Sequence, residues 1–324
     1  MRRVSVDSIL RRRLLLGGIG CIAIPGIGMA QSNVSLSQKP ITLVVPFAPG
    51  GGSDSIAREL GKYLSAKMGV PVVVDNRAGA GGAIAATSIA KAAPDGASLL
   101  FTTSTFVTHA ASDPTPTYNP SKDFAPVAML GRGPLLVVTS KASGLRSIQE
   151  LLSAAKSKPG ALTFCSAGPG SINHLAGEYF SQMAGIEMTH VPYKGSGPAT
   201  LDFLAGRTQV FFATVPTIRA HVRDDKVNLL AVTSATRAPM YPDTPTVMES
   251  GLPKYEVSTW WGVSAPAGTP SNVIAALNQA INEVSPQIKD RFVNEGATLV
   301  SESPAFFGEM IASELTAWSQ VMRR

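Results

Sequence analysis

Residues 41–54 read Ile41-Thr42-Leu43-Val44-Val45-Pro46-Phe47-Ala48-Pro49-Gly50-Gly51-Gly52-Ser53-Asp54, and this stretch decides the fold. Its first five residues form a short, mostly apolar run that predicts a buried β-strand. After the glycine turn, Ile56, Leu60, Tyr63 and Leu64 recur at helical spacing. A strand, a tight turn and an amphipathic helix in this order favour the α/β class.

The glycine turn itself has two interpretations. Gly50, Gly51 and Gly52 let the backbone approach a ligand closely, and the first-turn N–H groups of the next helix have no intrahelical acceptor. The partial positive charge of these N–H groups favours a carboxylate or a phosphate. The alternative is a tight connection that binds nothing, because glycine-rich turns are common between elements.

The first 30 residues are predicted to be a secretory signal peptide, which places the protein in the periplasm. Arginines at positions 2, 3 and 11–13 precede the apolar run 14–27, and Gly28-Met29-Ala30 is a small-x-small pattern for cleavage. This run is too short to span a membrane comfortably.

The route of export stays open at this point. The segment Arg11–Leu15 fits a twin-arginine signal and equally the arginine-rich start of an ordinary export signal. Cys21 is a candidate lipidation site. However, Gly18 occupies the position three residues upstream where a leucine is usual, which disfavours a lipoprotein.

The charge of the chain is carried largely by this leader. The chain has 28 Lys and Arg against 22 Asp and Glu, but residues 1–30 contain five arginines and one aspartate, which leaves a net charge of +2 for the rest. A nearly neutral chain with no basic cluster gives no support for nucleic-acid binding. Cys165 is the one cysteine after residue 30, so no intrachain disulfide is expected there.

Strands and helices alternate along residues 41–324, which favours an α/β protein with parallel sheets. Strands are predicted at 41–45, 72–74, 98–103, 162–165, 188–191, 210–213 and 229–233, and later helices at 83–92, 173–183, 199–204, 271–284 and 304–322. The apolar stretches Val127–Thr139 and Val257–Ala265 are candidates for strands that pass between two lobes. This division assigns residues 38–132 and 258–324 to lobe 1 and residues 133–257 to lobe 2.

A second glycine turn occurs in lobe 2. After the strand that ends at Cys165, the chain reads Ser166-Ala167-Gly168-Pro169-Gly170-Ser171 and then begins a helix. Two such helix starts on opposite sides of a hinge would face each other across a cleft, where α/β proteins usually bind ligands. The segment Tyr193–Gly197 adds a hydroxyl group and the cation of Lys194, although Lys194 also fits a solvated surface charge.

The order of motifs resembles the Bug-type periplasmic solute receptors of tripartite tricarboxylate transporters. The resemblance spans nearly all of the chain after the leader. It rests on Ile41–Asp54 with its Pro-Phe-x-Pro-Gly-Gly core, Asp75–Gly82, Ala92–Gly96, Phe124–Val127, His190–Gly195, Leu230–Ser234, Pro242–Thr246 and Ala265–Pro270.

This resemblance implies a two-lobed periplasmic-binding-protein fold, type II-like, that closes over a small carboxylate ligand. It also implies membrane components of a tripartite tricarboxylate transporter as partners, and we expect a monomer without a cofactor. The family's ligand site, carried over residue by residue, implies contacts from Phe47, Ala48, Gly51, Ser53, Asp54, Ser104, Ser166, Ala167, Gly168, Ser171, His174, Tyr193, Lys194 and Thr214. His174 could instead cap or pack within its helix, and His174 with Glu178 gives two metal ligands without a third, so no metal site is predicted.

One position departs from the family pattern. Where many relatives read Phe-Asp-Asn-x-Pro, this chain has Phe212-Ala213-Thr214-Val215-Pro216. A carboxylate at that position could recognise an ammonium group, and Ala213 cannot. We therefore expect a ligand without an amino group, such as a dicarboxylate or tricarboxylate, or a hydroxy or aromatic acid.

Two other function classes compete with a receptor. An exported α/β hydrolase needs an activated nucleophile, but the sequence has no Gly-x-Ser-x-Gly or His-Glu-x-x-His motif and no evident Ser/His/Asp arrangement. A ligand-sensing protein that feeds a signalling system shares the two-lobed architecture. The predicted export signal and the lack of a helix-turn-helix segment argue against a transcriptional regulator.

Overall fold

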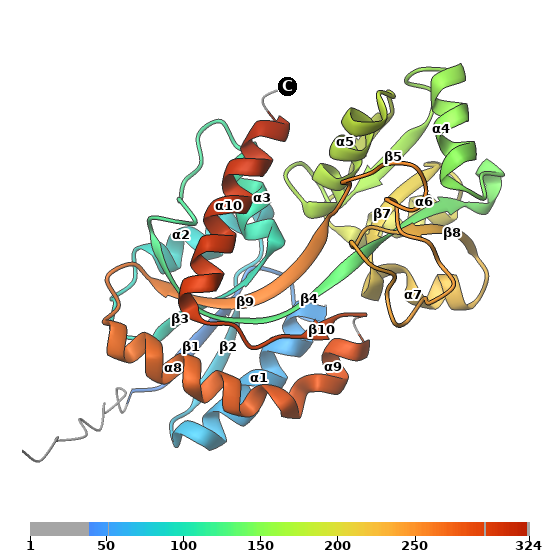
Figure 1. The fold of residues 1–324 in the computed structure, drawn as a ribbon. Coiled ribbons are helices and arrows are strands. Elements are labelled where there is room, and N and C mark those ends of the chain that lie inside the picture. Colours follow the sequence, from blue (N-terminus) through green and yellow to red (C-terminus); the bar gives the residue numbers. More distant parts are fainter. Residues whose placement is uncertain (1–38, 51, 295, 323–324) are drawn as a thin grey trace, which may run out of the picture. The chain divides into compact units, whose positions relative to one another are not determined.

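The computed structural model describes residues 39–50, 52–294 and 296–322 (Figure 1). The predicted signal peptide, Cys21 and Gly51 lie outside these residues. Within the described residues, no helix has both the length and the apolar character needed to cross a membrane.

The strands form two sheets that share one long strand. Sheet A has the order β2 (Val72–Asn76), β1 (Ile41–Val45), β3 (Ser98–Thr103), β9 (Ser258–Pro266) and β4 (Phe124–Ser140), with the short β10 (Thr298–Leu299) also on β4. Sheet B continues from β4 to β7 (Val210–Thr214), β5 (Thr163–Ser166) and β6 (Thr189–Pro192), with β8 (Val227–Val232) on β4. This α/β architecture confirms the predicted fold class.

The strand β4 passes from one sheet into the other. Residues 124–134 pair antiparallel with β9 in sheet A, and residues 135–140 pair with β7 and β8 in sheet B. The prediction of a continuous strand over Val127–Thr139 is thus confirmed. The predicted parallel pairing holds for β1 with its neighbours and for β5 with its neighbours, but the strands at the crossover are antiparallel.

A glycine in β4 allows the chain to pack closely at this crossover. A Cβ atom at Gly131 would lie 2.5 Å from the ring of Phe292 and 2.9 Å from the carbonyl oxygen of Thr298. Real Cβ atoms do not come this close to other heavy atoms. Gly131 therefore lets α9 and β10 lie against β4.

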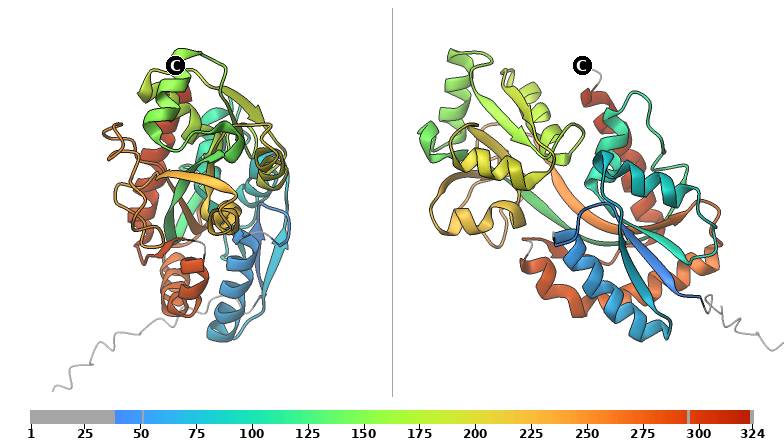
Figure 2. Two further views of the ribbon diagram at one scale, coloured as in Figure 1. Left: turned by 90° about the vertical axis from the view of Figure 1, so that its right-hand side faces the viewer. Right: turned by 180° about the vertical axis from the view of Figure 1, so that it is seen from behind.

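The helices cover both faces of the sheets (Figures 1 and 2). They are α1 (Gly52–Met68), α2 (Ala83–Ala90), α3 (Ser104–Ser112), α4 (Ile148–Ser157), α5 (Ile172–Ala184), α6 (Ser196–Leu204), α7 (Val215–Arg223), α8 (Ser271–Val284), α9 (Lys289–Asn294) and α10 (Pro304–Met322). Residues of α1, α8 and α9 share one buried apolar cluster, residues of α6 and α7 share another, and residues of α2, α3, α4, α5 and α10 share the third.

The helix α1 is an example of how burial of an apolar face fixes a helix on its sheet. Ile56 and Leu60 are fully buried, one turn apart on the face toward sheet A. Burying a side chain of this size contributes about 1.5–3 kcal/mol. The apolar spacing in the sequence therefore fixes which face of α1 packs on the strand β1, and so where the loop between them lies.

Candidate functional site

The loop between β1 and α1, which we call the first loop (residues 46–54), is closed by a carboxylate. Asp54 is 4% exposed. Its Oδ2 atom accepts from the N–H of Gly50 at 2.9 Å and from Nε of Arg58 at 3.0 Å, and its Oδ1 atom accepts from Nδ2 of Asn76 at 2.9 Å. The Asp54 carboxylate thus points toward its own loop, α1 and β2.

The electrostatics of the first loop follow from these bonds. Burial alone would raise the pKa of Asp54, but the hydrogen bonds from Arg58, Gly50 and Asn76 outweigh burial and lower it below 3.8. The charge on Asp54 is therefore compensated within the loop. The N–H groups of Gly52, Ser53 and Asp54 open α1, and no hydrogen bond from them to another described residue is present.

The apolar part of the first loop borders a small cavity. The carbonyl oxygen of Phe47 accepts from Asn76 at 3.0 Å, and its ring lines a space of about 10 Å³ beside Phe106 and Tyr118. This space is about the size of one water molecule. Ala48 is exposed.

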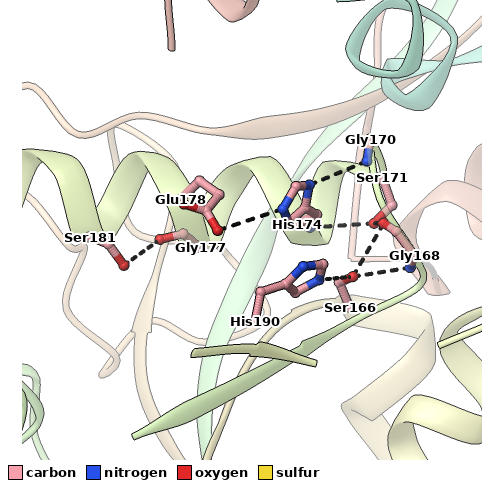
Figure 3. A network of polar contacts seen from close by, with 9 residues as sticks. All are labelled: Ser166, Gly168, Gly170, Ser171, His174, Gly177, Glu178, Ser181 and His190. Carbon is pink, nitrogen blue, oxygen red and sulfur yellow. Dashed lines mark hydrogen bonds and ion pairs between the residues drawn. The ribbon is translucent and has the colours of Figure 1, made fainter. Parts of the chain in front are cut away.

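The loop between β5 and α5, which we call the second loop (residues 166–174), is closed by hydroxyl, backbone and imidazole groups (Figure 3). The N–H of Gly168 donates to Oγ of Ser166 at 3.0 Å, and Oγ of Ser171 donates to the carbonyl oxygen of Gly168 at 2.7 Å. The N–H of Gly170 donates to Nδ1 of His174 at 3.2 Å, and the N–H of His174 donates back to Oγ of Ser171 at 3.3 Å.

These bonds change which amides are open to a ligand. The N–H groups of Gly168 and Gly170 are used by side chains of the second loop, whereas the sequence analysis considered only the N–H groups in the first turn of the helix that follows. In the described residues, the N–H groups of Ala167, Ile172 and Asn173 have no protein acceptor. The open amides on this side therefore belong to the residue after β5 and to the first turn of α5.

A histidine that the sequence did not predict supports the second loop. Nε2 of His190, on β6, lies 2.7 Å from Oγ of Ser166, and its ring stacks on His174 with centroids 4.0 Å apart (Figure 3). Burial, and then the neighbouring His174, lower the pKa of His190 to about 4. His190 is therefore neutral near pH 7, and Ser166 and His190 share one neutral hydrogen bond.

The helix α3 joins the second loop to the other lobe. The buried Oγ1 atom of Thr108 donates to the carbonyl oxygen of Gly170 at 2.7 Å. A Cβ atom at Gly170 would lie 2.4 Å from Oγ of Ser112 and 3.0 Å from Nδ1 of His109, so a glycine is needed for this approach. The same Nδ1 atom would lie 2.6 Å from a Cβ atom at Gly81, in the glycine segment before α2.

That glycine segment reaches the first loop in turn. A Cβ atom at Gly82 would lie 3.1 Å from the side chain of Pro46. Pro46, Gly82, Gly81, His109 and Gly170 therefore form a continuous line of contacts from the first loop to the second.

A second contact between the lobes lies near β7. Nη1 of Arg219, on α7, donates to the carbonyl oxygen of Asn294 at 2.6 Å. Thr214, the last residue of β7, occupies the N-cap position of α7 without a side-chain cap hydrogen bond, and its Oγ1 atom lies 2.8 Å from that of Thr217. Hydrogen bonds across the predicted lobe boundary therefore include those from Thr108 to Gly170 and from Arg219 to Asn294.

The remaining predicted residues have different environments. Oγ of Ser104, at the start of α3, is buried and lies 3.1 Å from Oγ1 of Thr259 on β9. The hydroxyl of Tyr193 donates to Asp202 on α6 at 2.9 Å; burial, and then this bond, raise the pKa of Tyr193 to about 12. Lys194 is exposed, and Ala213 is fully buried in the apolar cluster of α6 and α7.

Comparison with known proteins gives consistent matches to one family. Residues 56–324 match the family model of the tripartite tricarboxylate transporter family receptor. Protein BugT of Bordetella pertussis is 38% identical over 314 residues, which cover 95% of this chain and 96% of that protein. The resemblance to Bug-type receptors is therefore confirmed.

Two solved structures are similar as well. Rpa4515 of R. palustris with adipate has a TM-score of 0.81 at 34% identity and covers 88% of this chain and 96% of its own. MatC of Rhodopseudomonas palustris with bound malate has a TM-score of 0.79 at 31% identity and covers 88% and 99%. These similarities confirm the two-lobed periplasmic-binding-protein fold.

Proposed function

This chain belongs to the family of tripartite tricarboxylate transporter receptors, and we propose that it binds a small dicarboxylate between its lobes and delivers it to membrane proteins of such a transporter. The observation that carries this proposal is the contact from Thr108 to Gly170, which holds the second loop against α3. Through Gly81 and Pro46 the same helix reaches the first loop. In this proposal, the open amides at two helix starts, one from each lobe, donate hydrogen bonds to the same ligand.

The energy of these contacts is sufficient for a receptor. Each hydrogen bond from an amide to a charged carboxylate contributes about 1.5–3 kcal/mol before desolvation and ordering costs. A micromolar dissociation constant needs about 8 kcal/mol in all. Several such bonds, shared between the amides at Ser53 and at Asn173, reach this value. Because the ligand contacts both lobes only when they are close together, it favours the closed state.

The proposed ligand class is a dicarboxylate without an amino group. The related structures contain adipate and malate, and both are dicarboxylates without an amino group. Ala213 is fully buried among apolar side chains, so it offers no charge to an ammonium group. A carboxylate at that position would be needed to compensate such a group.

A calorimetric comparison of succinate with aspartate tests this ligand class, because the two molecules differ only in the amino group. Adipate and malate complete the panel. We expect at least one plain dicarboxylate to bind with a micromolar dissociation constant, and aspartate to bind at least tenfold more weakly than succinate. Tighter binding of aspartate than of every plain dicarboxylate would contradict the proposed ligand class.

Bulky substitutions test the proposed site. Phe47, Ala48, Gly51, Ser53, Asp54, Ser104, Ser166, Ala167, Gly168, Ser171, His174, Tyr193, Lys194 and Thr214 remain the proposed ligand-binding residues. Ala48→Trp and Ala167→Trp place an indole over the open amides of each loop, and we expect both to abolish dicarboxylate binding. Ser157→Trp, at an exposed position on α4, is the matched control. Unchanged affinity in both test variants, with the fold intact by circular dichroism, would rule out this pocket.

Export to the periplasm and a monomeric state are also part of the proposal. Family membership and the predicted leader of residues 1–30 support export. Fractionation of cells that produce the full chain should recover the shortened protein with the periplasmic contents, and light scattering should give the mass of a monomer. Retention of the full-length chain in the cytoplasm would contradict this part.

Among the described residues, the contact between Ser166 and His190 resembles part of an enzyme site. A hydrolase would use such a pair as nucleophile and base. Ser166, however, has no exposed surface, and its hydroxyl is shared with the backbone of its own loop. We therefore propose a receptor without catalysis, and bound dicarboxylate should be recovered chemically unchanged after prolonged incubation.

A further inference from the structure

A cavity beside the crossover strands lies outside both loops. Its volume is about 380 Å³, within the range of small-molecule sites. Its walls come from α10, from α5 and from the chain around β4 and the start of β9. None of its lining residues belongs to the proposed dicarboxylate site.

One wall contains a carboxyl group that has only one of its two oxygen atoms hydrogen-bonded to a described residue. Oε2 of Glu314, on α10, accepts from Nε1 of Trp260 on β9 at 2.9 Å. No described residue donates to the other oxygen. Burial, which outweighs the bond from Trp260 and the charge of Arg132, raises the pKa of Glu314 to about 7. The ionised form of this group therefore lacks a full counter-charge in the protein.

The neighbouring charges do not supply that counter-charge. Arg132, on β4, is the cation that lines the cavity, and its Nη2 atom lies 3.2 Å from Oε1 of Glu256 and 3.5 Å from Oγ of Ser258. Arg132 and Glu256 thus compensate each other. With Glu314 ionised, the described residues that line the cavity have a net charge of −1, which disfavours a second carboxylate ligand and favours a cation.

The other walls are aromatic. Tyr179 of α5 and Trp318 of α10 line the cavity, with an edge-to-face arrangement of their rings at a centroid distance of 6.0 Å. The faces of indole and phenol rings attract cations, and their hydrocarbon surface favours an alkyl chain. Aromatic walls beside an uncompensated carboxylate suit a protonated alkylamine.

We propose that this cavity binds a small organic amine in its protonated form, with the ammonium group at Glu314 and the alkyl part against Tyr179 and Trp318. The site is independent of the dicarboxylate site, since the two share no residue. Its ligand has the opposite charge.

Titration of the purified protein with n-butylammonium chloride, followed by calorimetry, tests the proposal at pH 8. We expect saturable binding with one site. Glu314→Gln keeps an oxygen that can accept from Trp260 but removes the charge, so we expect it to weaken butylammonium binding at least tenfold. Glu309→Gln removes an exposed carboxylate from the same helix and is the matched control, with an expected change below twofold.

The dependence on pH gives a second measure. Because the amine requires ionised Glu314, affinity should fall about tenfold for each pH unit below 7, and binding near pH 6 should release a proton, which calorimetry in two buffers of different ionisation enthalpy detects. The groups that face Glu314 are Arg132, Glu256 and Tyr179.

The outcomes are distinct. Absence of saturable butylammonium binding at millimolar concentrations, or equal binding by Glu314→Gln and the wild type, overturns the proposal. Dicarboxylate binding by Glu314→Gln at the wild-type level shows that the variant is folded. A negative result with butylammonium therefore does not bear on the proposed receptor function. A negative result with dicarboxylates does not bear on the amine site.

Discussion

The first and second loops occupy equivalent positions after parallel strands, yet they are stabilised by opposite means. The first loop is closed by a buried negative charge, Asp54, with Arg58 and Asn76 as its partners. The second loop is closed by the hydroxyls of Ser166 and Ser171 and by a ring nitrogen of His174. The difference shows that a helix start can keep open amides beside a charged side chain, provided that the charge is turned away and compensated.

The difference also predicts unequal roles for the two ends of a dicarboxylate. In the proposed complex, one end of the ligand would lie near a carboxylate whose charge is already balanced by Arg58. The other end would lie near hydroxyl and imidazole groups, with the Glu178 carboxylate 3.6 Å from Nε2 of His174. Four predictions test this contrast, beginning with the largest expected effect.

Removing the carboxylate of the first loop should cost more than removing a hydroxyl of the second. Asp54→Ala leaves the N–H of Gly50 and the Asn76 amide without their acceptor, so we expect a loss of about 3 kcal/mol in the free energy of unfolding. Ser171→Ala removes a helix cap, for which about 1 kcal/mol is typical. Urea denaturation measures both. Equal costs would show that the two loops are closed equally strongly.

The two loops should also respond to pH in different ranges. The pKa of His190 is lowered from 6.5 to about 4, so the stability gained from its neutral form is complete above pH 6.5 and is lost as pH falls to about 4. The pKa of Asp54 lies below 3.8, so its contribution is present above pH 3.8 and is lost only below that value. Unfolding curves of His190→Gln and Asp54→Asn against pH measure the two contributions.

In that experiment, the stability difference between His190→Gln and the wild type should change between pH 6.5 and 4. The difference for Asp54→Asn should stay constant in this range. A change near pH 6 in the stability difference between Asp54→Asn and the wild type would mean that Arg58 does not keep the pKa of Asp54 low.

The third prediction concerns the bond between the lobes. Thr108→Val has nearly the same shape as the wild type but cannot donate to Gly170, and a net hydrogen bond of about 1 kcal/mol corresponds to an increase of about fivefold in the dissociation constant for a dicarboxylate. Thr87→Val is the control, because its hydroxyl bonds Thr117 within lobe 1. Equal affinity of both variants would show that the bond from Thr108 plays no part in closure.

The smallest effect is expected at the margin of the second loop. Tyr193→Phe removes a hydroxyl that donates to the Asp202 carboxylate rather than toward the loop, and we expect less than a twofold change in dicarboxylate affinity by calorimetry. A change of tenfold or more would mean that this hydroxyl contacts the ligand after a rearrangement of α6.

The sequence predicted the parts of the fold that depend on apolar spacing. The helices α8 and α10 begin and end where they were predicted, and β3 does as well. The helices α3, α4, α7 and α9 were not predicted. The helix α4 has a readable signal, since Oγ of Ser147 accepts from the N–H of Glu150 in a capping box.

The helix α3 has no such signal. It begins Ser104-Thr105-Phe106-Val107-Thr108, and these residues have modest helix propensity; the packing of Phe106 and Val107 in the core is what stabilises it. Because α3 was not predicted, neither were Thr108 and His109, which join the loops. The use of the Gly168 and Gly170 amides by side chains was also beyond the sequence, because it depends on hydrogen-bond geometry.

The positions of the tryptophans allow movement of the strands that connect the lobes to be followed by intrinsic fluorescence. The chain contains three tryptophans, and all lie at or beside the crossover: Trp260 and Trp261 in β9, and Trp318 in α10. The two loops contain none. Intrinsic fluorescence should therefore report rotation of the strands that connect the lobes, while direct contact of the dicarboxylate with its site stays silent, so that closure can be followed in real time without an attached dye.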